Sequence, residues 1–266
     1  MGTFGRRLLL AVDAKGYGGV DVLTQRQLQE AIQRLLGEAA DAAGLQRERW
    51  ETQEAGDSVL AVLPEGASEP DLVDPFMRHL DAGLRAFNHG RLPEARLRLR
   101  AAVHFGTASP AANGFVGRAP VEIGRMLDSA MLRSALAAAP EACLALAVSA
   151  TVFNDVVREA YTTIRAQEFH EVLIEEKEYA GRAWIWVPGH DARALGLDGG
   201  APRGGGTRAG AGAGGDAGAS GGVGASGGGE APAVRPLSAP TAPADTVVQA
   251  FHGTVHAEGA VFGISK

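Results

Sequence analysis

The sequence predicts an α+β domain with one mostly antiparallel sheet and helices packed on one face of it. Residues 6–12 form an apolar run that stops at Asp13 and a glycine-rich turn, a pattern typical of a buried strand. Segments of helical and of alternating periodicity then follow in the order strand, helix, hairpin, helix, strand, helix, strand. After about residue 189 the composition changes abruptly. The folded domain is therefore predicted to span residues 6–188.

The first half of this domain gives the clearest local signals. Thr24 and Gln27 form a capping box in front of apolar residues at helical spacing, which predicts a helix there. A hairpin follows, because two alternating segments, residues 50–54 and 59–63, flank the turn Ala55-Gly56-Asp57. The sequence thus predicts a strand, a helix and a hairpin before residue 64.

The second half repeats the alternation of helices and strands. Ser68 caps a predicted helix that ends at His89-Gly90, and residues 97–103 alternate as a strand does. Further elements are predicted as follows: a helix over residues 120–138, a strand over 143–148, a short helix capped by Ser149, and a last hairpin over 168–187. This order is the ferredoxin-like βαββαβ arrangement with extensions.

Composition limits the classes of function. The net charge of −6 argues against general nucleic-acid binding, which needs a basic face. The alternating Arg96, Arg98 and Arg100 are interpreted as a solvated sheet face. The single cysteine, Cys143, lies in an apolar run and is interpreted as a core residue in a reducing compartment. The apolar run before Asp13 is too short for a signal peptide or a membrane span, so a cytoplasmic protein is expected.

The last third of the chain has a different character. Residues 189–246 are dominated by Gly, Ala, Ser and Pro, a composition that predicts a disordered linker. Apolar residues return over 247–266, where 250–255 and 260–264 are near-repeats. This tail resembles the C-terminal amyloid signalling motifs of bacterial effector proteins, which implies a signalling partner for residues 247–264. Alternatively, the tail adds a strand to the domain's own sheet edge.

Two aspartates are the candidate metal ligands. Asp13 ends the first predicted strand, and Asp57 lies in the turn of the hairpin expected to pair beside it. Carboxylates that converge at a sheet rim are typical of a Mg²⁺ site that also holds a phosphate-bearing substrate. The glycines that follow Asp13 leave backbone N–H groups for phosphate oxygens.

Four segments in the same order resemble the class III adenylate/guanylate cyclase family. They are Asp13-Ala-Lys-Gly16-Tyr17, Gly56-Asp57-Ser-Val-Leu, Val103-His104-Phe-Gly106 and Gly117-Arg-Ala-Pro-Val-Glu-Ile-Gly-Arg125-Met-Leu. A strand and serine at Leu146-Ala-Val-Ser149 extend the resemblance, which covers residues 6 to about 160.

The resemblance implies a cyclase fold and a head-to-tail homodimer that converts ATP or GTP to a cyclic nucleotide and pyrophosphate. It assigns Asp13 and Asp57 to Mg²⁺ or Mn²⁺ in a two-metal site. Arg125 matches the arginine that stabilises charge on the phosphoryl group, and it is the predicted catalytic residue. Gly16, Tyr17 and Gln53 are the predicted nucleotide-binding residues.

The sequence departs from the family at two of these places. Val121 stands where the family has an asparagine that stabilises the transition state, and Glu122 follows it. Gln53 replaces the lysine or glutamate that recognises the base. Loss of a single preorganised hydrogen-bond donor, here the asparagine amide replaced by Val121, typically lowers the rate about 10²–10³-fold. We therefore expect a Mg-nucleotide-binding signalling protein with weak or absent turnover. The alternatives are an active purine nucleotide cyclase and an effector recruited through its tail.

Overall fold

The computed structural model describes residues 5–112, 114–177 and 179–197, all within the first of two compact units, residues 1–206. The predicted tail, residues 247–266, lies outside the described residues, and so does the predicted linker beyond residue 197. Residues 189–197 continue the described domain, because Ala192 and Leu197 are buried in its core.

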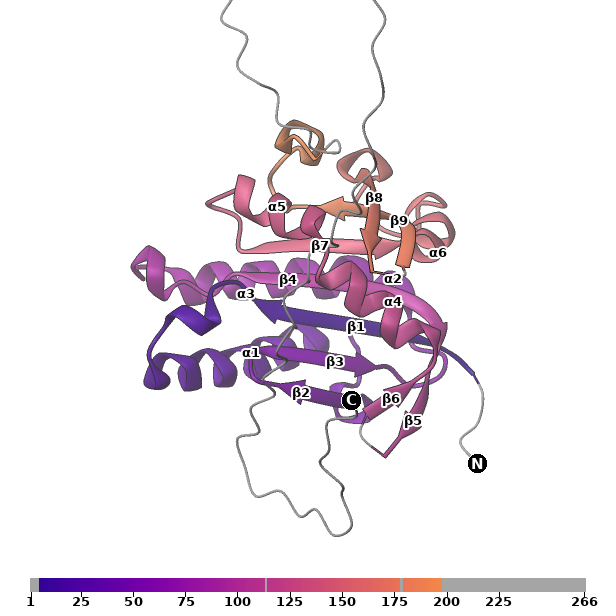
Figure 1. The fold of residues 1–266 in the computed structure, drawn as a ribbon, viewed down its shortest axis with the longest axis horizontal. Helices are drawn as coiled ribbons and strands as arrows, with labels where there is room; N and C mark the ends of the chain where they lie inside the picture. Colours follow the sequence, from indigo (N-terminus) through magenta and orange to yellow (C-terminus); the bar gives the residue numbers. More distant parts are fainter. Residues whose placement is uncertain (1–4, 113, 178, 198–266) are drawn as a thin grey trace, which may run out of the picture. The chain divides into compact units, whose positions relative to one another are not determined.

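A seven-stranded sheet forms the centre of the domain, in the order β2-β3-β1-β4-β7-β9-β8 (Figure 1). Only β4 and β7 pair in parallel within it, so the predicted, mostly antiparallel α+β sheet is confirmed. Its strands are β1 (Arg6–Ala14), β2 (Glu51–Ala55), β3 (Ser58–Val62), β4 (Leu99–Thr107), β7 (Leu144–Ser149), β8 (His170–Glu176) and β9 (Tyr179–Trp186).

Helices cover both faces of this sheet, whereas the sequence predicted helices on one face only. One apolar core lies between the sheet and α1, α3 and α6, and a second lies between the sheet and α4 and α5. The helices are α1 (Val22–Ala42), α2 (Glu69–Asp71), α3 (Met77–Asn88), α4 (Arg118–Leu127), α5 (Ala130–Ala138) and α6 (Ala150–Val152). Alternate residues of the central strands feed the two cores, as the two-residue period of a strand requires.

The first helix begins earlier than predicted. Asp21, not Thr24, is the N-cap of α1, and its side chain accepts a hydrogen bond from the Thr24 N–H at 3.0 Å. The predicted cap at Ser68 is present, and a π-helical stretch containing Pro75 joins α2 to α3. Proline removes a backbone donor, which is the physical reason for the irregular turn.

The second core shows where one predicted helix becomes two. Ser129 interrupts the helix predicted over residues 120–138, and its hydroxyl accepts a hydrogen bond from the Leu132 N–H at 3.2 Å to start α5. Cys143 is buried, which confirms its interpretation as a core thiol. Trp184 and Trp186 on β9 are buried on the first-core side, with Trp184 stacked on Phe153 at 4.4 Å between ring centroids.

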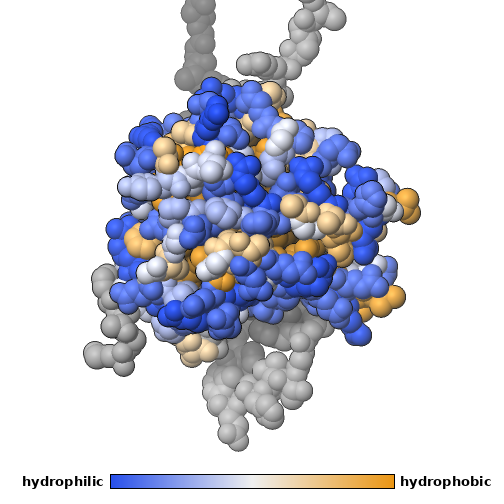
Figure 2. All heavy atoms as spheres, turned by 180° about the vertical axis from the view of Figure 1, so that it is seen from behind, coloured by the Kyte–Doolittle hydropathy of each residue, from blue (hydrophilic) through white to orange (hydrophobic). Residues whose placement is uncertain are grey.

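A separate two-stranded ribbon follows β4. It consists of β5 (Ser109–Ala111) and β6 (Gly114–Val116), and it reaches the β2 edge of the sheet (Figure 1). Figure 2 shows the face of the molecule seen from behind, where polar side chains surround smaller apolar patches. Within the described ranges, no helix has the length and apolar character needed to cross a bilayer.

Candidate functional site

The turn after β1 has the geometry that its glycines predicted. Gly16 adopts a φ of +83°, a left-handed conformation that side chains disfavour. A 3-10 turn, Tyr17–Gly19, follows and leads into α1. In the opposite hairpin Gly56 has a φ of +63°, which turns the chain at Asp57. The two glycines therefore set where the two aspartates lie.

Asp13 and Asp57 are neighbours, as the sequence predicted. The Ala14 N–H donates to the Asp57 Oδ2 at 3.3 Å, which places the Asp57 carboxylate beside the end of β1. Asp13 is buried, and burial raises the pKa of its carboxyl group, with a further upward contribution from the negative charge of Asp57. Asp57 thus lies in the turn just before β3, the strand that pairs antiparallel with β1, and its charge acts on Asp13.

The side chain of Arg100 is bound to the carboxylate of Asp13. The two residues are partners in the β1–β4 register, and the Arg100 Nε donates to Asp13 Oδ1 at 2.8 Å while Nη2 donates to Oδ2. The side chains of Arg100 and Asp13 are only 13% and 11% exposed. The interpretation of the alternating arginines as a solvated face was wrong for Arg100.

Arg98 is likewise not part of a solvated face. Its Nε donates to the Ala142 carbonyl at 2.7 Å, and its Nη2 donates to the carbonyls of Leu136 and Ala139. These carbonyls lie at and after the end of α5, where backbone acceptors have no partner within the helix. Arg98 therefore fastens α5 to the sheet, and its role is structural.

The donor chemistry of the aspartate pair fits a divalent cation. Carboxylate oxygens are the ligands that Mg²⁺ prefers, and protein sites for it commonly use one or two carboxylates with substrate phosphates. Among the described residues no group of three or more His, Cys, Asp or Glu side chains forms a metal centre. Asp13 and Asp57 would hold a cation only with further ligands from a bound phosphate or water, and Arg100 is already bound to both oxygens of Asp13.

Two predicted nucleotide-binding residues lie in the turn beside the aspartates, where part of the backbone is already used. The Lys15 N–H donates to the Arg98 carbonyl at 2.8 Å, and the Gly19 N–H donates to the Gly16 carbonyl at 3.0 Å. The Tyr17 hydroxyl accepts a hydrogen bond from the Gln29 Nε2 at 2.6 Å, which fixes the ring against α1. These hydrogen bonds attach the turn to Arg98, next to β4, and to Gln29 on α1.

Gln53 lies apart from this turn, on the exposed edge strand β2. The Gly114 backbone approaches it so closely that a Cβ on Gly114 would overlap the Gln53 amide. The ribbon formed by β5 and β6 therefore reaches the residue predicted to recognise the base. The structure brings Gln53 and Gly114 together, a contact that the sequence did not predict.

The predicted catalytic residue Arg125 lies on α4, the helix that carries Val121. Arg125 and Val121 line a cavity of about 280 Å³ together with Arg118, Glu122 and Tyr179. Val121 is 56% exposed, so its apolar side chain is presented outward at the position where the family has asparagine. Valine has no hydrogen-bond donor in its side chain.

Glu122 is instead largely buried, and its two partners were not predicted from the sequence. Its carboxylate lies 3.0 Å from the Nε2 of His104, a buried residue on β4, and it also pairs with Arg118. Burial lowers the pKa of His104, and the nearby Glu122 carboxylate opposes that shift. The His-x-Gly motif had identified His104 as notable, but nothing in the sequence gave its partner.

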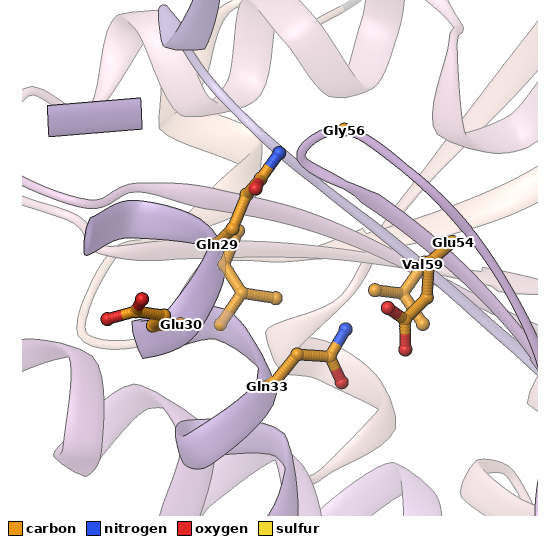
Figure 3. Close-up of a pocket in the computed structure, with 7 residues that line it drawn as sticks. Gln29, Glu30, Gln33, Glu54, Gly56 and Val59 are labelled. Atoms are coloured by element: carbon orange, nitrogen blue, oxygen red, sulfur yellow. The ribbon is translucent and has the colours of Figure 1, made fainter. Parts of the chain in front are cut away.

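A larger cavity, of about 530 Å³, lies between α1 and the β2–β3 hairpin (Figure 3). Gln33 and Glu54 extend toward it from opposite sides, and Gly56 forms part of its rim. Ile32 and Val59 also line it, and both belong to the first core. Asp13 and Ala11 are two residues apart on β1, so Asp13 lies on the face of the sheet that meets the second core. The cavity is lined by first-core residues and therefore lies on the opposite face from Asp13.

Comparisons with known proteins agree with this architecture. Neither a protein-family model nor a curated protein matches the sequence. The adenylate/guanylate cyclase/hydrolase from Silicibacter pomeroyi is similar in structure, with 19% identity and a TM-score of 0.51 over 71% of this chain and 99% of that one. A bacterial light-regulated adenylyl cyclase has 13% identity and a TM-score of 0.50, over 73% of this chain and 56% of that one. The described domain therefore has the fold of the class III adenylate/guanylate cyclases.

Proposed function

We propose that this domain is a divergent class III nucleotidyl cyclase-like module that binds a Mg-nucleoside triphosphate and converts it to cyclic nucleotide slowly or not at all. One observation carries the proposal: the Asp57 carboxylate accepts a hydrogen bond from the Ala14 N–H, next to Asp13, and its charge acts on Asp13, in a domain with the cyclase fold. These two residues are the predicted metal ligands that such a module would use.

Binding would use the residues around this pair. Asp13 and Asp57 would hold Mg²⁺ or Mn²⁺, which supplies positive charge for the triphosphate when bound. Gly16 and Tyr17 would position the phosphates, because the left-handed turn at Gly16 begins three residues after Asp13. Gln53 would contact the purine of ATP or GTP, and the ribbon end at Gly114 beside it would narrow the choice of base.

Weak turnover follows from α4. Val121 cannot donate a hydrogen bond, and Glu122 is held by His104 and Arg118. Arg125 alone would stabilise charge that develops on the phosphoryl group, where a preorganised donor is normally worth about 10²–10³ in rate. The proposed assembly is a homodimer, in which α4 of one subunit meets the aspartates of the other. The exposed apolar side chains of Val116 and Val121 support a contact there.

Calorimetry on the full chain tests the binding part of this proposal. We expect Mg-ATP or Mg-GTP to bind, and Asp57→Asn to abolish the magnesium-dependent part of the affinity. Asp41→Asn, a substitution at an exposed residue near the end of α1, serves as the matched control for loss of one carboxylate. Absence of nucleotide binding by the unmodified protein would refute the proposal.

The rate of turnover is measured in a separate assay. Purified protein is incubated with ATP or GTP and Mn²⁺, and cyclic nucleotide and pyrophosphate are quantified over hours. The proposal predicts little or no product from either substrate, with Asp57→Asn as the blank. Rapid formation of a cyclic nucleotide that Asp57→Asn removes would favour an active cyclase instead. Analytical ultracentrifugation with and without nucleotide tests the homodimer.

A further inference from the structure

We propose that Arg100 is a built-in competitor of the divalent cation, so that metal binding at Asp13 requires Arg100 to leave the carboxylate. The inference rests on the proposed function, because it concerns the same pair of aspartates. It adds a regulatory property: the chain carries its own cation in its candidate metal site.

The contacts of Arg100 support this competition. Its guanidinium donates to both oxygens of Asp13, which are the two atoms that a metal would use. Arg100 and Asp13 are direct partners on paired strands, so the backbone holds them opposite each other. A dication at the carboxylate would also be repelled by the fixed positive charge beside it.

Burial makes the competition strong. Both side chains are nearly enclosed, at 13% and 11% exposure, so the pair is little screened by water or salt. With Arg100 in place, the net charge of Asp13, Asp57 and Arg100 is one negative charge instead of two. Metal affinity depends on ligand charge, so the free site should bind a dication weakly.

One nitrogen of the Arg100 guanidinium nevertheless makes no hydrogen bond within the described residues. Its Nη1 is buried and has no hydrogen-bond partner in the part of the chain that the structure describes. A buried donor without a partner costs free energy, so this nitrogen does not help to hold the side chain in place. Arg100 is therefore held chiefly by its two hydrogen bonds to the charged Asp13. A nucleotide that brought both a dication and phosphate oxygens would replace that partner and supply acceptors for Arg100.

Manganese binding to the full chain without nucleotide tests the proposal, with free Mn²⁺ followed by electron paramagnetic resonance. Four proteins are compared: the unmodified chain, Arg100→Gln, Arg96→Gln, and Arg100→Gln combined with Asp57→Asn. Arg96 is the matched control, because it precedes the same strand and its ion pair with Glu141 is exposed. Circular dichroism verifies that each variant is folded.

We expect the unmodified chain to bind Mn²⁺ with a Kd of about 1 mM or weaker, and Arg100→Gln to bind at least about tenfold more tightly. Arg96→Gln should behave as the unmodified chain. The gain should vanish when Asp57→Asn is added, because a dication at this site needs both carboxylates. Mn²⁺ should also raise the Tm of Arg100→Gln more than that of the unmodified chain.

Two results would overturn the proposal. One is a folded Arg100→Gln protein whose Mn²⁺ affinity equals that of the unmodified chain. The other is tight binding by the unmodified chain, with a Kd below about 10 μM. If Arg100→Gln does not fold, Arg100→Met takes its place, since it removes the positive charge and keeps an unbranched side chain. An Mn²⁺ affinity of folded Arg100→Met no tighter than that of the unmodified chain would then contradict the proposal.

The failure of this inference can be told from the failure of the proposed function. The manganese titration contains no nucleotide, so a gain in Arg100→Gln that depends on Asp57 supports the competition by itself. Calorimetry at saturating Mn²⁺ tests nucleotide binding separately. A protein that gains metal affinity but never binds ATP or GTP would retain this inference and refute the proposed function.

Discussion

The end of β1 and the helix α4 carry the two halves of the predicted site, and they depart from the expected chemistry in different ways. At β1 the expected carboxylates are present, but Arg100 of the same chain neutralises Asp13. On α4 the expected donor is missing, because Val121 stands in its place. The neighbouring Glu122 is engaged with His104 and Arg118.

The two departures differ in whether they can be reversed without a change in sequence. Under the competition proposed above, another cation would replace Arg100 at Asp13 without a change in sequence, so the first half of the site would remain available for binding. No rearrangement of Val121 can supply an amide, so under the proposed function the second half would lack a donor for the transition state unless a partner provides one. Binding and turnover are therefore expected to separate in this protein.

The largest expected effect on stability is at the β1 end. Arg100→Ala removes one partner of a buried pair and leaves Asp13 enclosed without a cation. Breaking such a pair typically costs about 3–5 kcal/mol. Urea unfolding followed by circular dichroism measures the loss, and Arg96→Ala, at an exposed ion pair, should cost no more than about 1 kcal/mol.

A double variant sharpens this measurement. Adding Asp13→Asn to Arg100→Ala removes the buried charge, so part of the lost stability should return. A double variant as unstable as the sum of the single ones would show that the pair contributes no coupling, contrary to its geometry.

The next largest expected effect is on the rate of turnover and concerns α4. Val121→Asn places an amide donor on the exposed face of α4, where the family has one. If the rest of the site is competent, the rate of cyclic nucleotide formation with Mn²⁺ should rise by up to about 10²–10³. Product is measured by mass spectrometry after incubation with ATP and with GTP.

Val121→Thr is the matched control for this gain. Threonine is close to valine in shape and carries a hydroxyl, but that group is too short to replace a side-chain amide. An equal rate in Val121→Asn, Val121→Thr and the unmodified chain would mean that the missing donor is not what limits turnover. Nucleotide binding itself should be nearly unchanged in both variants.

A third prediction concerns pH at the His104–Glu122 pair. Burial lowers the pKa of His104 in the folded protein, whereas in the unfolded chain it is about 6.5. The unfolded chain therefore binds the proton more readily, and stability should be fully present above pH 6.5 and fall as the pH drops below it. His104→Gln should weaken this dependence.

Thermal unfolding between pH 7.5 and 5.5 checks the prediction. His79→Gln, which replaces a histidine on the exposed side of α3, is the control that should keep the pH dependence. A steeper acid loss in His104→Gln than in the unmodified chain would contradict the direction of the shift.

Much of the fold was predictable from the sequence because its signals are local. The apolar run before Asp13, the turn at Gly56-Asp57 and the cap at Ser68 each specify their own element. The covering of both faces of the sheet was not predicted, since α4 and α5 have apolar stripes that do not reveal which face they meet. The break at Ser129 was missed because the apolar spacing continues across it.

The site divides in the same way. The position of Asp13 and Asp57 followed from a strand end and a hairpin turn, both local features. The partners Arg100 and His104 became visible only through the β1–β4 register and the packing of α4, which join residues far apart in the chain. The alternating arginines were predicted to face solvent. The two-residue period of a strand shows which side chains share a face, but it does not show whether that face is covered by other parts of the chain.

The smallest expected effect is at the outer end of the α4 cluster. Arg118 is 84% exposed, although it pairs with Glu122 four residues along the helix. Such surface pairs contribute about 0.2–1 kcal/mol, so Arg118→Ala should lower the free energy of unfolding by no more than that. Salt should reduce the difference further, because the guanidinium faces water. Urea unfolding at low and at high salt measures it. A loss as large as that of Arg100→Ala would mean that the two ion pairs do not differ in the way their burial requires.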